Sequence, residues 1–376
     1  MRVAHVSDVY LPRTGGIESQ VRGLSQAQFA SGVHVEIFTA TPARKGHPVI
    51  EGEVDNGVPI HRLAVDLPGQ LPISPQIGPR LGRLLSEHAD VIHVHGGLVS
   101  PFAWPALTTA VHAGIPAVVT IHSVWAGWSR LFAAANNVTG WRRWPVIWTT
   151  VSEVAAVPIR KALAGSAEVR ILPNGIDIEG WHSHEHPNHD DRELVVISVA
   201  RLAVRKRSLA LIDMMEQVRK QLPADIKLRL LMVGDGPDRS KVERATASKG
   251  MNWVECVGWK SAPEIRELFG QADVFINPTQ LESFGIAALE ARTYGLPVVA
   301  LNGSGVTEFI EDGQEGLLAN DDTGLVAALV QLATDRSLLE KITKYNHDNE
   351  PRFGWPSVIA TAGQMYRDAI ELASGP

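Results

Sequence analysis

Two glutamates eight positions apart, Glu282 and Glu290, flank a Phe-Gly turn in the stretch QLESFGIAALE. Two such carboxylates could act as an acid/base pair, be unrelated surface charges, or accept hydrogen bonds from a ligand rich in hydroxyls. In glycosidases the paired carboxylates approach one bond from opposite sides, about 5 to 9.5 Å apart. Here DVFINPT reads as a strand and FGIAALEARTYG as a helix closed by Gly295, so both carboxylates follow the same strand. This placement favours a clamp for hydroxyls over an acid/base pair.

Positively charged side chains follow an earlier predicted strand. In VARLAVRKRS, Arg201 and Lys206 lie five positions apart in the loop after ELVVISV. Two cations at a strand exit suit a diphosphate, because arginine offers a planar fork and lysine a compact charge. The alternative is that residues 205–207 are a solvated basic helix start. Cations in a first helical turn oppose the helix dipole, so phosphate binding is the better interpretation.

Glycines at other strand exits indicate close approach to a nucleotide. Gly15 and Gly16 precede an amphipathic helix, where paired glycines let backbone N–H groups reach an anion; a flexible turn is the alternative. VGDGPDRSKVE begins at Gly234 like a dinucleotide fingerprint, but Arg239 stands where the third glycine belongs, which disfavours a dehydrogenase. After the glutamate loop, a phosphate would meet the backbone N–H groups of Phe284, Gly285 and Ile286.

Histidines also follow predicted strands in the first half. His122 comes just after PAVVTI, where it either faces a ligand or is a satisfied structural residue. His93 and His95, in VIHVHGG, point to one side of a strand end. Without a third ligand we interpret them as the lining of a cleft and not as a metal site.

Alternating strand and helix patterns must position these residues. The runs RVAHVS, VHVEIFTA, DVIHVHG, IPAVVTIH and PVIWTTVS predict strands of a parallel sheet in the first half. The pattern restarts with ELVVISVARL, KLRLLMVGDG, WVECVG, ADVFINP and LPVVALNG. At 376 residues the chain is longer than one core usually grows. The predicted fold is α/β, with two Rossmann-like doubly wound domains facing across a cleft.

We predict an N-terminal domain over residues 1–178, a linker over 179–193 and a C-terminal domain over 194–354, followed by a C-terminal helix over 355–376 that packs back on the N-terminal domain. The linker region, IEGWHSHEHPNHDDRE, is polar, contains Pro187 and has no periodicity. A tract of this composition binds metal only if it folds around it, so we interpret its histidines as solvated. They are His182, His184, His186 and His189.

The overall composition limits the partners and the compartment. With 45% hydrophobic residues, 20% charged residues and a net charge of -6, nothing marks the chain as a nucleic-acid binder or a disordered tail. The single cysteine, Cys256, excludes an internal disulfide and fits a reducing compartment. No window approaches the ~18 uninterrupted apolar residues of a membrane-spanning helix, and the N-terminus lacks the apolar stretch of a signal peptide. We expect a cytoplasmic protein, with association with the inner face of the membrane left open.

Residues 124–161 combine aromatic and basic side chains, a mixture that suits peripheral contact with anionic lipid headgroups. The alternative is that PVIWTTVS is a core strand and the other tryptophans pack or line an acceptor pocket. The span holds half of the chain's ten tryptophans and a single acid, Glu153. Its aromatic and basic members are Trp125, Trp128, Trp141, Trp144, Trp148, Arg130, Arg142, Arg143, Arg160 and Lys161.

In this order and spacing, the motifs resemble the retaining glycosyltransferases of family 4, which have the two-domain GT-B fold. The resemblance runs through nearly the whole chain in TGG, HVHG, TIHS, LPNGID, ARLAVRK, VGDGP, VGW and ESFGIAALE, and the last matches the family's E-x7-E motif. The chain departs from the family's G-R-L-x-x-x-K-G pattern at Ala200 and Arg207, which replace glycines.

The resemblance implies a nucleotide-sugar donor held mainly by the second domain. Glu290 would accept from the ribose hydroxyls, and Glu282 would hold the donor sugar. Arg201 and Lys206 would neutralise the diphosphate, and His122 would lie near the transferred sugar. The remaining donor-binding positions implied are Gly15, Gly16, Gly234, Gly258, Trp259, Ser283, Phe284, Gly285 and Ile286.

The resemblance also implies the reaction. A hexose of the mannose or glucose type would pass from a GDP- or UDP-sugar to a glycan or glycolipid acceptor, with retention at the anomeric carbon. No cofactor or metal is expected, which agrees with the lack of an Asp-x-Asp pair in these loops. Two rivals stay open: a GT-B isomerase or phosphorylase, which needs no external alcohol acceptor, and a sugar-nucleotide sensor that does not turn over.

Overall fold

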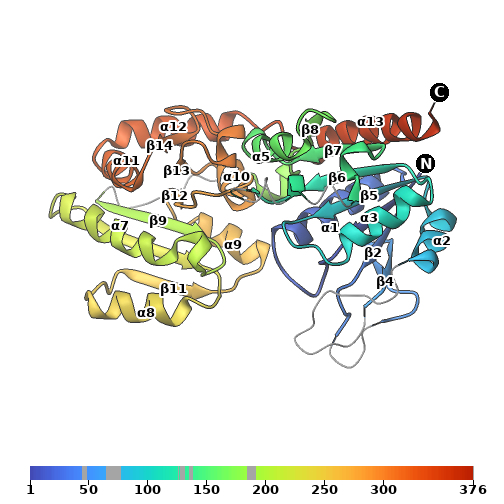
Figure 1. The fold of residues 1–376 in the computed structure, drawn as a ribbon. Coiled ribbons are helices and arrows are strands. Elements are labelled where there is room, and N and C mark those ends of the chain that lie inside the picture. The colour runs from blue at the N-terminus through green and yellow to red at the C-terminus, as the bar shows by residue number, and fades with distance from the viewer. Residues whose placement is uncertain are drawn as a thin grey trace. The chain divides into compact units, whose positions relative to one another are not determined.

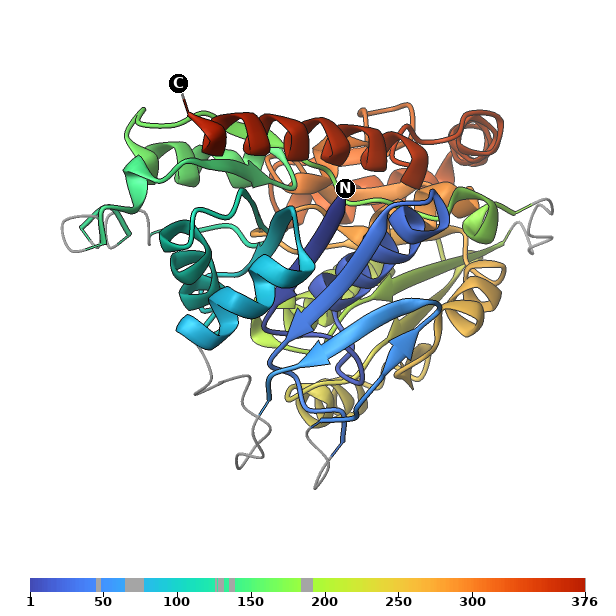
Figure 2. The same cartoon turned by 90° about the vertical axis from the view of Figure 1, so that its right-hand side faces the viewer.

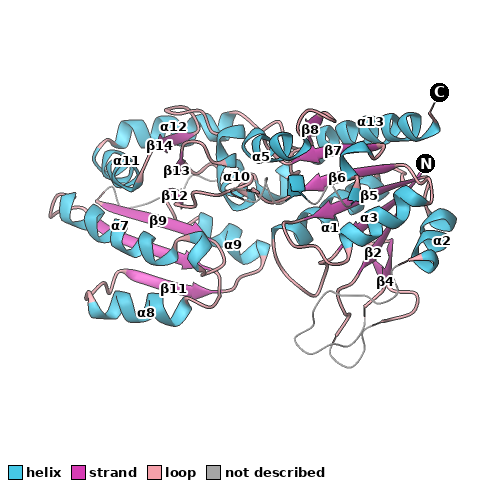
Figure 3. Cartoon of the chain, viewed as in Figure 1, coloured by secondary structure: helices cyan, strands magenta, loops and turns pink. Residues whose placement is uncertain are grey.

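The computed structural model describes residues 1–44, 49–64, 78–125, 127, 132–134, 139–183 and 192–375. The chain forms two compact units, coloured by residue number in Figure 1. Unit 1 contains Met1–Ile176 together with Phe353–Pro376, and unit 2 contains Asp177–Arg352. Both are mixed α/β units in which helices cover parallel sheets, as the colouring by secondary structure in Figure 3 makes plain.

Unit 1 is built on a sheet with the strand order β3-β4-β2-β1-β5-β6-β7-β8 among the described residues. All its neighbours pair in parallel except β3 and β4. The strands are β1 (Arg2–Ser7), β2 (His34–Thr39), β3 (Val54–Asp55), β4 (Val58–Arg62), β5 (Val91–Gly96), β6 (Ala117–Ile121), β7 (Val146–Thr150) and β8 (Val169–Ile171). The helices are α1 (Gly16–Ala30), α2 (Pro79–His88), α3 (Ala103–His112), the 3₁₀ turn Trp141–Arg143, α5 (Glu153–Leu163) and α13 (Trp355–Ser374).

Alternate residues of these strands enter two different cores, because successive side chains of a strand point to opposite faces. Val94 and Val119 pack beneath α2, α3 and α5. On the other face, Val91 and Val118 pack against α1 and α13 through Leu24 and Val358. Figure 2 shows α13, in red, lying along this sheet although it is the last helix of the chain.

Unit 2 is built on a parallel sheet with the order β11-β10-β9-β12-β13-β14. Its strands are β9 (Glu193–Val199), β10 (Lys227–Val233), β11 (Val254–Gly258), β12 (Val274–Asn277), β13 (Val298–Leu301) and β14 (Gly316–Ala319). Its helices are α6 (Ile178–Trp181), α7 (Ser208–Gln221), α8 (Arg239–Ser248), α9 (Ala262–Phe269), α10 (Ile286–Tyr294), α11 (Asp322–Thr334) and α12 (Arg336–Asp348), with 3₁₀ turns at Val204–Lys206 and Gly305–Glu308. Aliphatic residues of β9 and β10 pack with α7 and α11 in its largest core.

The ten strands expected from the sequence are confirmed as β1, β2, β5, β6 and β7 in unit 1 and β9 to β13 in unit 2. The additional strands β3, β4, β8 and β14 were not predicted from the sequence. None of the described helices is both long and apolar enough to span a membrane.

The predicted linker over 179–193 is partly wrong, because its first residues belong to helix α6. The Asp177 side chain caps this helix by accepting from the Gly180 N–H at 3.2 Å. Trp181 is buried, with its ring centroid 5.7 Å from that of Phe269. The buried Trp181 ring and the Asp177 cap thus stabilise a helix at the start of a segment whose polar composition suggested a linker. His184, Pro187 and the other residues from 184 to 191 lie outside the described residues.

The four tryptophans of residues 124–161 that the structure describes pack in the core of unit 1. Trp125, Trp141 and Trp148 are 1%, 7% and 2% exposed, and Trp144 packs partly buried against the same core. The prediction that these rings anchor a membrane is therefore wrong, and the alternative of core packing is confirmed for them. Trp128 and Arg130 lie outside the described residues.

Candidate functional site

The strand order of unit 2 creates a switch point between β9 and β12. From β9 the chain proceeds through β10 to β11 on one side, and then returns to β12 on the other side of β9. In open parallel sheets, ligands bind beyond the carboxyl ends of strands where the order reverses in this way. The residues predicted from Arg201 to Glu282 follow the carboxyl ends of β9 to β12, so they meet at one edge of the sheet.

A charged pair bridges the two loops at this switch point. Lys206, at the end of the 3₁₀ turn after β9, lies with its Nζ 2.6 Å from Oε2 of Glu282, in the loop after β12. Asn277, the last residue of β12, donates to the same oxygen at 3.3 Å. Glu282 is only 9% exposed, so the lysine is held by a buried carboxylate. Its ammonium group keeps two further N–H donors that an anionic ligand can use.

The two other cations of this loop behave differently. Arg201 is exposed directly after β9 and has no ion-pair partner among the described residues. Arg207 has a left-handed backbone with φ of 58°, and its guanidinium binds both carboxylate oxygens of Asp322 at 2.8 and 2.7 Å. It also donates to the carbonyl oxygen of Pro278 at 3.0 Å. A position at which the family pattern has glycine thus keeps the glycine-like φ here, and the arginine fastens the loop to α11.

The loop that contains Gly305 packs against the backbone of the loop 282–285. The Gly305 N–H donates to the Glu282 carbonyl at 2.8 Å, and a Cβ on Gly305 would lie 2.2 Å from the Ser283 carbonyl oxygen. Gly285 has φ of 93° at the N-terminal end of α10. The Phe284 ring is buried beside Phe309, so this residue can offer a ligand only its backbone. Ile286 is the first residue of α10.

Glu290 lies in the second turn of α10 and is half-buried. It has no hydrogen-bond or ion-pair partner among the described residues, in contrast to Glu282. Burial raises the pKa of the Glu290 carboxyl to about 8. A ligand that donates hydrogen bonds to this carboxylate would stabilise its charged form, which has no such donor among the residues that the structure describes.

Gly234, directly after β10, and Gly258, the last residue of β11, allow the ends of these strands to lie against each other. Gly234 has φ of 130°, and its N–H donates to the Gly258 carbonyl at 2.8 Å. A Cβ on Gly234 would lie 2.0 Å from the Ala200 carbonyl oxygen, so no larger residue fits. Trp259, directly after β11, is 59% exposed and offers a flat aromatic surface at this edge.

Gly15, Gly16 and His122 belong to unit 1, and each unit is described by itself. Gly15 precedes α1 with an extended φ of 177°, so the backbone conformation does not require glycine there. A Cβ at this position would meet the Glu18 carboxylate at 2.6 Å, because that side chain folds back over the start of the helix. The Glu18 carboxylate thus lies where the predicted phosphate would bind.

His122 follows β6 and lies in a group of buried histidines. Its Nε2 is 3.1 Å from Nδ1 of His95, and burial lowers the pKa of His122 to about 4. His93 and His95 were predicted to line a cleft, and the structure places both of them, buried, at the wall of a small cavity within unit 1. With His122 they border this cavity, which also contacts Gln20 and Trp355.

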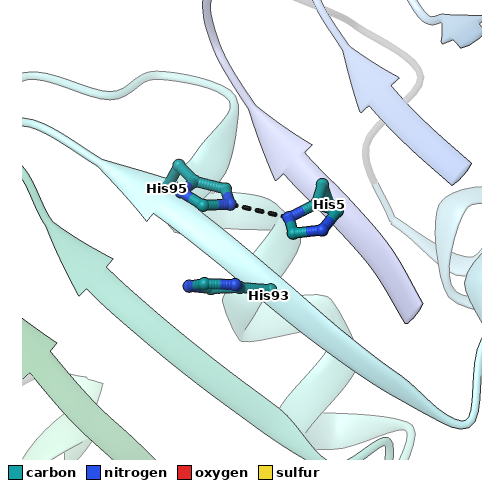
Figure 4. A group of neighbouring side chains, drawn as sticks. All are labelled: His5, His93 and His95. Carbon is teal, nitrogen blue, oxygen red and sulfur yellow. Dashed lines mark hydrogen bonds between the residues drawn. The ribbon is translucent and has the colours of Figure 1, made fainter. Parts of the chain in front are cut away.

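Two groups among the described residues have the donor types of a metal site. His5, His93 and His95 lie close together in Figure 4, but all their ring nitrogens are engaged in hydrogen bonds, and burial lowers the pKa of each. Glu36 Oε2 lies 2.6 Å from Nε2 of His61 and 2.7 Å from Nδ1 of His88. Hydrogen bonds explain why the side chains of each group lie together. Neither group includes a predicted catalytic residue, although His95 of the first group contacts His122.

The structure brings the predicted residues of unit 2 to one edge of its sheet and places those of unit 1 in a separate body. Sequence reasoning missed Asn277, Asp322 and Gly305, which hold the carboxylate, the basic loop and the α10 loop in place. Only Gly305, in NGSG, has a sequence signal, since a glycine-rich turn after a strand marks close backbone approach.

Comparison with known proteins bears directly on this arrangement. The model of the Glycosyltransferase Family 4 matches residues 14–179, and that of the Glycosyl transferases group 1 matches residues 181–348. The alpha-monoglucosyldiacylglycerol synthase of Acholeplasma laidlawii is 24% identical over 99% of this chain and 98% of its own length. A GDP-mannose-dependent alpha-(1-6)-phosphatidylinositol monomannoside mannosyltransferase of Mycobacterium tuberculosis is 25% identical over 89% of this chain and 90% of its own.

Among solved structures, that of HepE from Anabaena in complex with UDP and glucose superposes with a TM-score of 0.73. The superposition covers 98% of this chain and 99% of HepE at 17% identity. At this identity the similarity establishes the fold, which is GT-B.

Proposed function

The chain belongs to the family 4 glycosyltransferases, enzymes of the GT-B fold that use sugar-nucleotide donors, and on this premise we propose that it transfers a hexose from a GDP- or UDP-sugar to a glycan or glycolipid acceptor with retention of anomeric configuration. The hexose is of the mannose or glucose type. The relatives named above include a glucosyldiacylglycerol synthase and a GDP-mannose-dependent enzyme, and the HepE structure holds UDP with glucose.

One observation supports this assignment more than any other: the Lys206–Glu282 pair bridges the switch point, with an unpaired Glu290 on the helix that follows. In our proposal the diphosphate of the donor binds at Lys206 and Arg201, beside the N-terminus of α10. Glu290 accepts hydrogen bonds from the ribose hydroxyls and Glu282 from the donor sugar. The base lies near Gly258 and Trp259, with Gly234, Ser283, Phe284, Gly285 and Ile286 supplying close backbone approach.

The chemistry follows from where charge develops. The bond between the anomeric carbon and the donor phosphate oxygen breaks, so negative charge grows on the leaving diphosphate while the sugar acquires oxocarbenium character. Arg201 and Lys206 stabilise that charge more in the transition state than in the ground state. The acceptor hydroxyl attacks the same face that the diphosphate leaves, and its proton passes to the leaving phosphate oxygen. No metal is required, because the two cations meet the phosphate charge.

Unit 1 supplies the remaining residues in this proposal. His122 lies near the transferred sugar, and Gly15 and Gly16 approach the diphosphate, which then displaces the Glu18 carboxylate from the start of α1. The acceptor binds to unit 1.

Peripheral membrane contact through residues 124–161 is proposed on its exposed basic side chains alone. Arg143 and Lys161 are exposed, whereas Trp125, Trp141 and Trp148 are buried. Co-sedimentation with vesicles containing phosphatidylglycerol is expected to fall when both are changed to glutamate. Binding that does not depend on the anionic lipid content of the vesicles would exclude this contact.

The experiment that tests the function is thermal stabilisation by GDP, UDP, ADP and their hexose conjugates, followed by transfer assays with the donor that stabilises. A ligand at 100 times its Kd contributes about 2.7 kcal/mol to stability, which is well within detection. Stabilisation by one base, its loss in Glu290→Ala and transfer to an added acceptor support the proposal. Turnover without an acceptor would indicate an isomerase or phosphorylase, binding without turnover a sensor, and no nucleotide binding would remove the proposal.

A further inference from the structure

A single chain of hydrogen bonds runs through the interior of unit 1 and ends at His122. Its members come from β1, β5, β6 and β7 and from the helices α1 and α13 that cover the same face of the sheet. Each member is hydrogen-bonded to the next in the order His122, His95, His5, Gln28, Tyr366, His93, Thr120, Thr149 and the carbonyl of Val119. Figure 4 shows three of the histidines on the neighbouring strands β1 and β5.

The far end of the chain sets its direction. A carbonyl oxygen only accepts, so the Thr149 hydroxyl donates to Val119 at 3.0 Å. The Thr149 hydrogen is then used, so Thr120 donates to Thr149 across 2.6 Å. The Thr120 hydrogen is used in turn, and the 2.7 Å contact with His93 Nε2 requires that nitrogen to carry the hydrogen.

The same reasoning passes through the middle of the chain. With hydrogen on Nε2, a neutral His93 accepts at Nδ1, so Tyr366 donates to it at 2.8 Å. The Tyr366 oxygen is left to accept from the Gln28 amide nitrogen at 3.0 Å, which turns the amide oxygen toward His5 at 2.8 Å. Because that oxygen only accepts, His5 carries its hydrogen on Nε2.

The last two links reach His122. His5 accepts at Nδ1 from His95 Nε2 at 2.8 Å, and His95 then accepts at Nδ1 from His122 Nε2 at 3.1 Å. In the reversed direction Thr149 would donate to Thr120, so its hydrogen bond to the Val119 carbonyl would be lost. The forward direction makes every hydrogen bond of this chain, and an unmade buried hydrogen bond is costly.

We propose that this chain of hydrogen bonds holds His122 in the tautomer with hydrogen on Nε2. The Nδ1 lone pair of His122 then accepts a hydrogen bond from a hydroxyl of the bound sugar. His95, His5 and Gln28 act as positioning residues. The tautomer follows from the contacts within unit 1 alone, whereas the sugar as ligand depends on the proposed function.

Two further observations agree with this tautomer. Burial lowers the pKa of His5 and of His122 to about 4, so both rings are neutral at pH 7 and carry one hydrogen each. The Nδ1 of His122 has no hydrogen-bond partner in the part of the chain that the structure describes, and the side chain borders the small cavity beside Gln20 and Asn174. A fixed acceptor selects a ligand hydroxyl and repels a phosphate or carboxylate oxygen.

The test is ¹⁵N NMR of protein labelled at histidine nitrogens, without any ligand. We expect His122, identified from the spectrum of His122→Asn, to show a protonated Nε2 and an unprotonated Nδ1 that do not change between pH 6 and 8. A proton on Nδ1, averaging between the two tautomers, or titration in this range would overturn the proposal. This measurement does not depend on what the protein binds.

A substitution that interrupts the chain of hydrogen bonds tests the positioning residues. In Gln28→Met, a change of similar size, the His5 Nε2–H loses its acceptor, so His5, His95 and His122 are expected to exchange between tautomers. The matched control is Ser25→Ala, a buried position on the same helix whose hydroxyl bonds only within α1, and its His122 signals should match the wild type. An unchanged His122 in folded Gln28→Met would refute the role of the chain; if Gln28→Met does not fold, the wild-type spectrum still decides the tautomer.

Binding measurements with UDP-glucose against UDP, and with GDP-mannose against GDP, test the ligand. Loss of one hydrogen bond of about 1 kcal/mol weakens binding about fivefold. Gln28→Met should lose this factor for the sugar conjugate and none for the free diphosphate. Equal loss for both would remove the sugar hydroxyl from the proposal. If the wild type binds none of the four, the proposed function fails while the spectrum still decides the tautomer.

Discussion

The raised pKa of Glu290 predicts that donor binding releases a proton. Hydroxyl donors favour the charged carboxylate, and the group must ionise to receive them because its pKa without ligand is about 8. The apparent Kd then scales with 1 + 10^(8 − pH). Affinity for the donor should therefore rise about ninefold between pH 6 and 7 and about fivefold between pH 7 and 8, with little change above. At pH 7 about 0.9 proton should leave with each bound donor.

Isothermal titration calorimetry provides the assay. Titrations of the stabilising nucleotide sugar in two buffers with different ionisation enthalpies count the protons, and a pH series gives the Kd. The intact conjugate is used because its diphosphate, esterified at both ends, does not titrate in this range. Glu290→Gln keeps the shape and one acceptor but cannot ionise, so its Kd should be independent of pH. A wild-type Kd that stays flat from pH 6 to 8 with no proton release would refute the clamp at Glu290.

Three further outcomes follow from the same geometry. Lys206→Ala should lower kcat roughly 100-fold, because the leaving diphosphate loses a cation, whereas Lys220→Ala, which removes an exposed helix pair with Glu216, should leave kcat unchanged in steady-state assays. Gly234→Ala should lower the Tm by several degrees, since its Cβ would lie 2.0 Å from the Ala200 carbonyl, and Gly250→Ala, which has positive φ but open space, should lower the Tm less in calorimetric scans. Transfer activity should survive dialysis against EDTA; activity restored only by an added divalent cation would contradict the metal-free mechanism.

The strands and the edge at which the site forms could be predicted because their signals are local. Each buried parallel strand is a run of β-branched residues, and the residue after it necessarily lies at the carboxyl edge of the sheet. Lys206, Glu282 and Glu290 were found in this way, and the family resemblance named their roles. Their pairing was not predicted, because Lys206 and Glu282 are 76 positions apart and their contact depends on the order of the strands.

Partners contributed by distant parts of the chain could not be read from the sequence. The N-terminus of α3 is capped by Asp8, which accepts from the Phe102 N–H at 2.7 Å across 94 positions. Tyr366 completes the histidine chain from a helix at the other end of the sequence. The membrane prediction for the tryptophans was wrong for a related reason. A sequence of interleaved aromatic and basic residues is the same whether the rings face lipid or a core, and only the packing distinguishes the two.

The return of α13 to unit 1 makes unit 2 an insertion within unit 1. The two crossings lie side by side, since the Ile176 N–H donates to the Phe353 carbonyl at 3.0 Å. During synthesis, all of unit 2 therefore leaves the ribosome before the helix that covers the sheet face of His5 and His93. The first sheet to be made is therefore the last to be completed, because the hydrogen bond between Tyr366 and His93 can form only after unit 2 has been synthesised. Unit 2, contiguous in sequence, has no such delay and can fold first.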